Sequence, residues 1–374
     1  MDYDLLHTEL AARKLPAFRE RQIRHAVGKN LLHGWEALST LPKQLRGELS
    51  GAVAWNTVEI DHAEHSGDGS SKLRMTTSDG FPIEAVLMRF DQPHATGDQR
   101  TSRFTACLSS QSGCALSCTF CATGRMGLGR SLTRYEIFDQ FLTLSRIRAE
   151  RGEGRIDNVV MMGMGEPFHN YDEVLAACRL MNDADGPGLG ARRIAISTVG
   201  WIPGIERLAT EDIQVKLALS LHAPNDEIRA ELMPVNKRYP IRELIAACRD
   251  YRAATNRRVF IEYLMLEGIN DQPEHARELA ALIGSEGFHV NLIAYNPTGT
   301  SYVGSSGEAV RTFAHVLERC DVSASYRVSR GRDISAACGQ LAAPVAAARK
   351  AALDKRRADR AAAGVSVTAN AALV

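Results

Sequence analysis

Three closely spaced cysteines constrain this chain more than any other feature. Cys114, Cys118 and Cys121 form a Cys-x3-Cys-x2-Cys motif, and Cys107 lies one loop upstream, at the end of an apolar run. Soft sulfur ligands suit iron–sulfur clusters, which take one thiolate per iron. A four-iron cluster held by only three thiolates keeps one iron with an open coordination position. The motif therefore predicts a cluster whose open iron binds a small molecule.

Two other interpretations of these cysteines stay open at this point. Cys107 could complete a four-cysteine structural zinc site, although zinc sites ordinarily use two Cys-x2-4-Cys pairs separated by a loop. The thiols could instead be reduced and buried. The cluster is the favoured interpretation because neither alternative accounts for the spacing.

Composition limits the class of protein. The 374 residues are 45% hydrophobic and 24% charged, as in ordinary soluble globular proteins. A formal net charge of +1 gives no overall attraction to nucleic acid, so an RNA-binding surface would need local clusters of basic residues. No apolar run approaches the roughly 20 residues of a membrane span, and the first residues lack signal-peptide character. With eight cysteines, we expect a cytoplasmic protein with metal or redox chemistry and no membrane partner.

After Cys121 the sequence alternates between apolar strand-like runs and amphipathic helical stretches, a pattern typical of parallel sheets covered by helices. With the strand that precedes the cysteines, about seven strands are predicted. The predicted fold class is α/β, a partial (β/α) barrel short of the full eight strands. The predicted strands are 156–162, 194–197, 215–221, 259–266, 290–295 and 324–328, and the predicted helices are 135–148, 173–181, 241–251, 274–283 and 309–320.

Three further regions flank this predicted core, which spans 103–340. Residues 1–52 show helical periodicity with several basic side chains, and we predict an RNA-docking accessory domain. Residues 53–102 alternate with period two and predict a β-rich extension. Residues 341–374 are rich in Ala and Arg and predict a partly disordered tail.

Polar residues and glycines follow the predicted strands where those strands end. In parallel barrels the chemistry gathers at the carboxyl ends of the strands, so these residues predict one pocket mouth above the cluster. Cys338 follows the last strand among small residues that leave its sulfur approachable, although a lone Cys is usually a buried small hydrophobe. The candidates at the strand ends are Gly165, Glu166, Ser197, Ser220, His222 and Asn296.

Several motifs in the same order resemble the RlmN/Cfr family of radical S-adenosylmethionine (SAM) methyltransferases. The cysteine motif resembles the radical SAM signature. The likeness covers roughly residues 55–345. The runs that resemble this family are Met162-Gly-Met-Gly-Glu-Pro, Ser220-Leu-His-Ala-Pro-Asn and Ala337-Cys-Gly-Gln-Leu.

The resemblance implies a radical route with two SAM molecules per turnover. The three motif cysteines would ligate a [4Fe–4S] cluster whose open iron binds SAM, and Cys338 would take a methyl group from the first SAM. A second SAM, cleaved at the cluster, would give a deoxyadenosyl radical that activates this methyl group for addition to an adenine carbon. Cys107 would then form a disulfide with Cys338 and release the base, and Glu84 matches the family's proton acceptor. The residues that match the family's SAM contacts are Gly165, Glu166, Ser197, Ser220, Leu221, His222 and Asn296.

The implied substrate is an adenosine of 23S ribosomal RNA, with transfer RNA as a further candidate. Ala223 after His222 is similar to RlmN-like members, which methylate carbon 2. Ser335 is similar to Cfr-like members, which methylate carbon 8, but the longer run around Ala223 favours carbon 2. We expect a monomer served by an external one-electron donor such as flavodoxin or ferredoxin. The competing hypotheses are a zinc-stabilised, non-catalytic RNA-binding protein and a radical enzyme acting on a peptide or small molecule.

Overall fold

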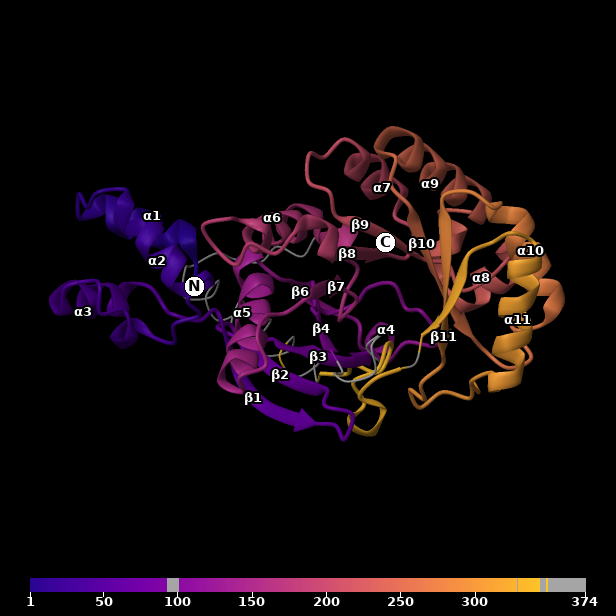
Figure 1. The fold of residues 1–374 in the computed structure, drawn as a ribbon, viewed down its shortest axis with the longest axis horizontal. Helices are drawn as coiled ribbons and strands as arrows, with labels where there is room; N and C mark the ends of the chain where they lie inside the picture. The colour runs from indigo at the N-terminus through magenta and orange to yellow at the C-terminus, as the bar shows by residue number, and fades with distance from the viewer. Residues whose placement is uncertain (93–100, 328, 344–347, 349–374) are drawn as a thin grey trace, which may run out of the picture.

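A computed structural model describes residues 1–92, 101–327, 329–343 and 348. Within these ranges ten strands form one sheet in the order β1-β2-β3-β4-β7-β8-β9-β10-β11-β12. The first four pair antiparallel, and the seven from β4 to β12 pair parallel, which confirms the predicted partial barrel (Figure 1). The strands are β1 (Val58–His65), β2 (Ser71–Thr77), β3 (Pro82–Gln92), β4 (Thr101–Cys107), β7 (Asn158–Met161), β8 (Ile194–Thr198), β9 (Lys216–Ser220), β10 (Val259–Met265), β11 (Phe288–Ala294) and β12 (Ala324–Arg327).

Helices cover the outer face of the parallel strands (Figure 1). Five of them follow the predicted amphipathic stretches, and two short ones, α7 and α8, were not predicted as helices. No helix in the described ranges is long and apolar enough to cross a membrane. The helices are α5 (Arg134–Glu150), α6 (Tyr171–Asn182), α7 (Ile202–Ala209), α8 (Asp226–Leu232), α9 (Ile241–Thr255), α10 (Pro273–Ile283) and α11 (Gly307–Arg319).

Alternation along each parallel strand separates the core from the barrel lumen. On β9, Leu217 and Leu219 are fully buried in the main hydrophobic core. Lys216, Ala218 and Ser220 instead line cavities inside the barrel, because successive side chains of a strand point to opposite faces. Every second position of these strands is therefore available to a ligand.

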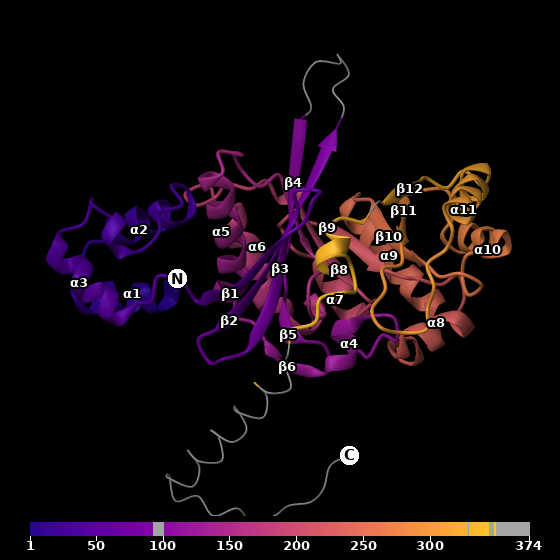
Figure 2. The same cartoon turned by 90° about the horizontal axis from the view of Figure 1, so that it is seen from below.

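The N-terminal segment forms three helices set to one side of the barrel (Figures 1 and 2). Trp35 and Trp55 pack edge to face at 5.3 Å, and the Trp35 indole donates to the Val53 carbonyl at 2.8 Å. The division of the chain into domains stays a prediction, and most of the predicted tail lies outside the described residues. The helices are α1 (Tyr3–Ala12), α2 (Phe18–Gly28) and α3 (Lys43–Ala52).

A small ribbon closes the loop that carries the three motif cysteines. Strand β5 (Gln111–Gly113) pairs antiparallel with β6 (Leu128–Ser131), and the Cys114 amide donates to the Gly127 carbonyl at 3.0 Å. Gly113 has φ +79°, and a Cβ at this position would lie 2.0 Å from the Gly127 oxygen. Only glycine fits there, so the loop is closed by backbone contact and not by side chains.

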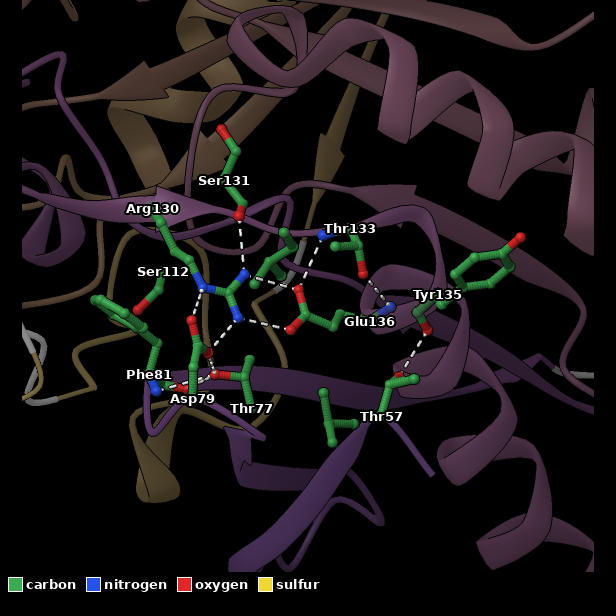
Figure 3. Close-up of polar contacts among 12 residues, drawn as sticks. Thr57, Thr77, Asp79, Phe81, Ser112, Arg130, Ser131, Thr133, Tyr135 and Glu136 are labelled. Atoms are coloured by element: carbon green, nitrogen blue, oxygen red, sulfur yellow. Dashed lines mark hydrogen bonds and ion pairs between the residues drawn. The ribbon is translucent and has the colours of Figure 1, made fainter. Parts of the chain in front are cut away.

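Arg130 anchors this ribbon to the rest of the fold (Figure 3). Its guanidinium donates to both carboxylate oxygens of Glu136 on α5, at 2.6 and 2.8 Å, and also to Asp79 in the β2–β3 turn. Glu136 in turn forms a capping box with Thr133 at the start of α5. Charge-assisted bidentate pairs of this kind fix orientation as well as adding stability.

We predict that Arg130→Ala destabilises the protein by about 2 kcal/mol, because the nearly buried Glu136 carboxylate loses its charged partner. Urea denaturation of the metal-free protein measures this change. Arg277→Ala, which breaks the exposed pair with Glu274 on α10, is the matched control and should change stability by less than about 0.5 kcal/mol. Equal stability losses for both variants would contradict an anchoring role for Arg130.

Candidate active site

Two adjoining cavities occupy the inside of the barrel. The upper cavity, ≈ 160 Å³, lies at the carboxyl ends of the parallel strands, and the lumen cavity, ≈ 200 Å³, extends toward their amino ends. The series Phe260, Glu262, Leu264 on β10 shows the arrangement, since Phe260 lines the lumen cavity, Leu264 the upper cavity and Glu262 both. The residues that line both cavities are Met162, Glu262, Ile293 and Cys338.

The three motif cysteines line the upper cavity together. Cys114 follows β5, and Cys121 immediately precedes α4 (Ala122–Met126). Burial raises the pKa of Cys114 to about 12 and that of Cys118 further, so these sulfurs carry charge only when a cation holds them. In the described part of the chain no three His, Cys, Asp or Glu side chains form a single-ion site. A four-iron cluster does not require the three sulfurs to meet at one ion, because each thiolate ligates its own iron.

Cys107 does not join this group. It ends β4 and lines the lumen cavity, whereas the three motif cysteines line the upper one. Burial, and secondarily the nearby Cys338, raise the pKa of its thiol well above the ordinary value. Cys107, the fourth ligand of the alternative zinc site, therefore lies in a different cavity from the other three cysteines.

Glu166 is fully enclosed at the end of the loop after β7. Its two carboxylate oxygens accept from the Phe168 and Val199 amides, both at 2.9 Å. Burial raises its pKa to about 7, against the opposing effect of these amides. Glu166 therefore ties the β7 and β8 loops together at the wall of the upper cavity.

His222 lies at the end of β9 with a left-handed backbone, φ +58°. Its Nδ1 accepts from the Leu264 amide at 3.0 Å, and its carbonyl accepts from Asn270 at 2.8 Å. Burial lowers the pKa of the imidazole to about 3, so the ring is neutral and its proton resides on Nε2. A neutral His222 can offer one N–H donor to the upper cavity, which its side chain lines.

The other predicted SAM contacts divide into two groups. Gly165, Ser197 and Ser220 line the upper cavity, with the two serine hydroxyls 3.1 Å apart. Leu221 and Asn296 are buried beside it and do not line it. Asn296 Oδ1 is nevertheless a buried acceptor with no hydrogen-bond partner among the described residues.

A buried arginine that the sequence analysis missed joins the ends of β8 and β9. Arg229 on α8 is fully buried, and its guanidinium donates to the Val199 carbonyl at 2.5 Å and the Leu221 carbonyl at 3.2 Å. Both carbonyls follow strands that end at the upper cavity. Because α8 carries several charged residues, its sequence suggests a solvent-exposed helix, which is the usual environment of arginine. The burial of Arg229 therefore could not be predicted from the local sequence.

Cys338 lies on the wall between the two cavities, within a C-terminal segment of residues 336–343 that we call the relay loop. The Gly339 carbonyl accepts from the Ala122 amide at 2.8 Å, and the Leu341 carbonyl accepts from the Thr123 hydroxyl at 2.7 Å. Both donors belong to α4, the helix that follows Cys121. In Figure 2 this gold segment lies between β3 and the other barrel strands.

Glu84 lies apart from both cavities. It lines a third hollow beneath the relay loop, where its Oε2 accepts from the Ala342 amide at 2.8 Å. Burial raises the pKa of its carboxyl group. Ser335 lines the same hollow. The structure therefore brings Cys338 and Cys107 together but leaves Glu84 one loop away.

Comparison with known proteins places the chain in a family. Residues 108–280 match the radical SAM superfamily. The chain is 44% identical over 344 residues to a probable dual-specificity RNA methyltransferase RlmN from Parafrankia, covering 88% of this chain and 87% of that protein. It is 43% identical over 304 residues to a ribosomal RNA large subunit methyltransferase N from Nitrosopumilus maritimus, covering 80% and 85%. The chain belongs to the RlmN family of radical SAM methyltransferases.

A solved structure agrees with this membership. The crystal structure of a radical SAM methyltransferase from Sphaerobacter thermophilus has a TM-score of 0.85 to this chain at 44% identity, covering 91% of this chain and 97% of that one. The relationship extends over nearly all of the chain. It confirms the family resemblance and the fold class inferred from the sequence.

RlmN-family membership implies a [4Fe–4S] cluster and SAM, and the residues present fit both groups. Three thiols on one cavity wall are the donor set that a cluster with one open iron requires. Beside them, the Ser197 and Ser220 hydroxyls supply polar groups for SAM. The unpartnered Asn296 oxygen is a further acceptor, next to Tyr295, which lines the cavity.

We predict that His222→Asn removes a pH-dependent loss of stability. In the unfolded chain His222 is protonated below its ordinary pKa of 6.5. In the folded protein it stays neutral until the pH falls to about 3. Stability therefore falls as pH drops from 6.5, by up to about 1.4 kcal/mol per pH unit from this residue. Asn keeps an acceptor for the Leu264 amide and tolerates positive φ.

Urea denaturation of the metal-free protein at pH 7.5, 6.0 and 5.0 measures this effect. The variant should lose less stability than the parent between pH 6.5 and 5.0. The slopes of unfolding free energy against pH should differ by up to about 1.4 kcal/mol per pH unit, which corresponds to one proton. Parallel stability curves for the two proteins would show that the pKa of His222 is the same in the folded and unfolded chain, which would contradict the lowered pKa.

Proposed function

We propose that this protein methylates carbon 2 of an adenosine in 23S ribosomal RNA, with transfer RNA as a second substrate, through a methylated Cys338. The supporting observation is that Cys338 lines two cavities at once. One of these cavities is lined by the three motif cysteines, and the other by Cys107. A side chain in this position can receive a group on one side and deliver it on the other.

The upper cavity is the proposed cofactor site. Cys114, Cys118 and Cys121 would hold the cluster, and SAM would bind beside it, two molecules being used per turnover. When bound, these groups supply a methyl group and the one-electron chemistry that activates it. Glu166 and His222 hold the strand-end loops in the conformation that forms the cavity wall.

The lumen cavity is the proposed site of the target adenine. A base must leave its stack to react inside an enzyme, and a cavity of ≈ 200 Å³ next to Cys338 accommodates an everted base. The target carbons of adenine are electrophilic and cannot attack a sulfonium methyl directly. Transfer through Cys338 therefore gives the base a reaction partner suited to its chemistry.

Cys107 is the proposed release group. Burial keeps its thiol protonated, which protects the methyl-bearing Cys338 from early attack. Once the base is joined to Cys338 through the transferred carbon, the Cys107 sulfur would bond to the Cys338 sulfur as the Cys338–carbon bond breaks, and the released carbon would take up a proton to become the methyl group. An external dithiol reductant would return the disulfide to two thiols for the next turnover. Glu84 is the proposed proton acceptor. The Ala342 amide donates to its carboxylate, and this hydrogen bond connects Glu84 to the relay loop that carries Cys338.

Carbon 2 is favoured over carbon 8 by two observations. The Parafrankia relative described above carries the name RlmN, which agrees with the RlmN-like run around Ala223. Ser335, the one Cfr-like position, lines the hollow beside Glu84 and neither of the two barrel cavities. It is therefore poorly placed to select a ring carbon. The proposal further includes a cytoplasmic monomer and an external electron donor, flavodoxin or ferredoxin, because reductive cleavage of SAM requires an electron.

Nucleoside mass spectrometry of ribosomal RNA from cells with and without this gene tests the reaction. We predict that 2-methyladenosine is lost with the gene and restored by the intact gene. Appearance of 8-methyladenosine instead would establish the alternative carbon. Unchanged RNA methylation in both strains would reject the proposed function.

Cysteine variants test the relay itself. Cys338→Ala should abolish methylation, because the group that carries the methyl is gone. Cys107→Ala should accumulate protein covalently joined to RNA, visible as an RNase-sensitive shift on denaturing gels. Cys178→Ala, at a buried position of α6 that lines neither cavity, is the control and should turn over normally. Free methylated RNA at normal yield from Cys107→Ala would contradict the release step.

A further inference from the structure

The amino-terminal opening of the barrel lumen is surrounded by basic side chains. Arg103 on β4, Arg193 just before β8 and Lys216 at the start of β9 all line the lumen cavity. Arg330, in the segment before the relay loop, lines it as well. These residues are far apart in the sequence, and the barrel gathers them because its strands begin at the same edge. A chain with a net charge of +1 thus concentrates four cations at one opening.

The arginines of this opening form no ion pair within the described ranges, although Arg330 lies near enough to Asp91 to help lower the pKa of that carboxyl group. Among the described residues no ion pair joins Arg103, Arg193 or Arg330 to an acidic side chain, and the Nε atoms of Arg103 and Arg330 are buried without a hydrogen-bond partner. Nearby acids already have other partners, since Asp91 pairs with Arg89 and Asp157 accepts from the Phe104 amide. The opening therefore has excess positive charge and unused donors, which favours an anionic ligand.

Two aromatic rings lie beneath these cations. Arg103 and Arg330 each lie 5.3 Å from the centre of the Phe90 ring, and Lys216 lies 5.7 Å from that of Phe260. Both rings line the lumen cavity. Aromatic faces stack on nucleic-acid bases without regard to sequence, and adjacent cations contact the phosphates.

The interior of the lumen leaves space above this opening. Its lining includes the small side chains of Thr105 on β4, Ala195 on β8 and Ala218 on β9, beside larger ones such as Phe260, which is in register with Ala218. A base could therefore pass from the opening to Cys338 at the far wall, while its sugar and phosphates stay at the opening. The three motif cysteines lie at the opposite end of the barrel.

We propose that the target RNA enters through the amino-terminal opening and that Arg103, Arg193, Arg330 and Lys216 bind the phosphates on either side of the everted nucleotide. This inference rests on the proposed function for the identity of the ligand as RNA. It adds the direction of entry, opposite to the cofactor cavity, and the residues that recognise the backbone.

Salt-dependent binding of an unmodified transcript of the target 23S ribosomal RNA hairpin tests the inference. Fluorescence anisotropy without SAM, from 50 to 300 mM KCl, gives the slope of log Kd against log salt for each protein. Each lost phosphate contact lowers this slope by about 0.7 for single-stranded RNA. We expect that decrease for Arg103→Ala, Arg193→Ala and Lys216→Ala, and the parental slope for Arg193→Lys.

Arg277→Ala on the outer helix α10 is the matched control and should keep the parental slope. Arg193 and Lys216 are exposed, so their variants keep the test decisive even if Arg103→Ala fails to fold. Parental slopes for all three alanine variants would overturn the inference. Methylation of the same transcript by the parent protein is measured in parallel: methylation with unchanged slopes rejects only the entry route, and lowered slopes without methylation reject only the proposed function.

Discussion

Two hydrogen bonds between the relay loop and α4 hold this site together. The Ala122 amide and the Thr123 hydroxyl donate to the carbonyls of Gly339 and Leu341, at 2.8 and 2.7 Å. They join the segment that follows the last strand to the helix that follows the motif cysteines. The Ala342 amide adds a third contact, since it donates to Glu84 on β3 at 2.8 Å. With these contacts, the position of Cys338 is fixed relative to the loop that would hold the cluster.

The incomplete barrel gives access to Cys338 from two sides. Side chains at alternate positions of the parallel strands face the lumen, and small residues such as Ala195 and Ala218 keep it open. The polar strand ends and motif cysteines form one end, and the basic opening forms the other. Two different ligands can then approach one sulfur from opposite sides, without competing for the same entrance.

Much of the fold and part of the candidate site could be predicted from the sequence, because they depend on residues that are close together in the chain. The cysteine spacing, the seven parallel strands and the polar strand ends at Ser197, Ser220 and His222 all follow from short-range patterns. The Pro and Gly residues in the first turn of α7 masked that helix, where a Cβ on Gly204 would lie 2.6 Å from Phe168. Propensity could not show that Gly204 is required for packing.

The rest depends on distant segments that meet only in the folded chain. The basic opening combines Arg103, Arg193, Lys216 and Arg330, which share no motif. Glu84 resembled a proton acceptor by its place in the strand, yet its carboxylate binds the Ala342 amide more than 250 residues later. Likewise, Cys107 lies close to the triad in sequence but lines a different cavity.

The most direct test of Cys338 as the carrier between the two cavities is to follow a labelled methyl group. Anaerobically reconstituted protein is incubated with SAM bearing a deuterated methyl group, without RNA, and the peptide containing Cys338 is weighed by mass spectrometry before and after RNA is added. The account predicts a labelled methyl group on Cys338 that is lost as the RNA becomes methylated. RNA methylation by a protein whose Cys338 never carries the label would contradict it.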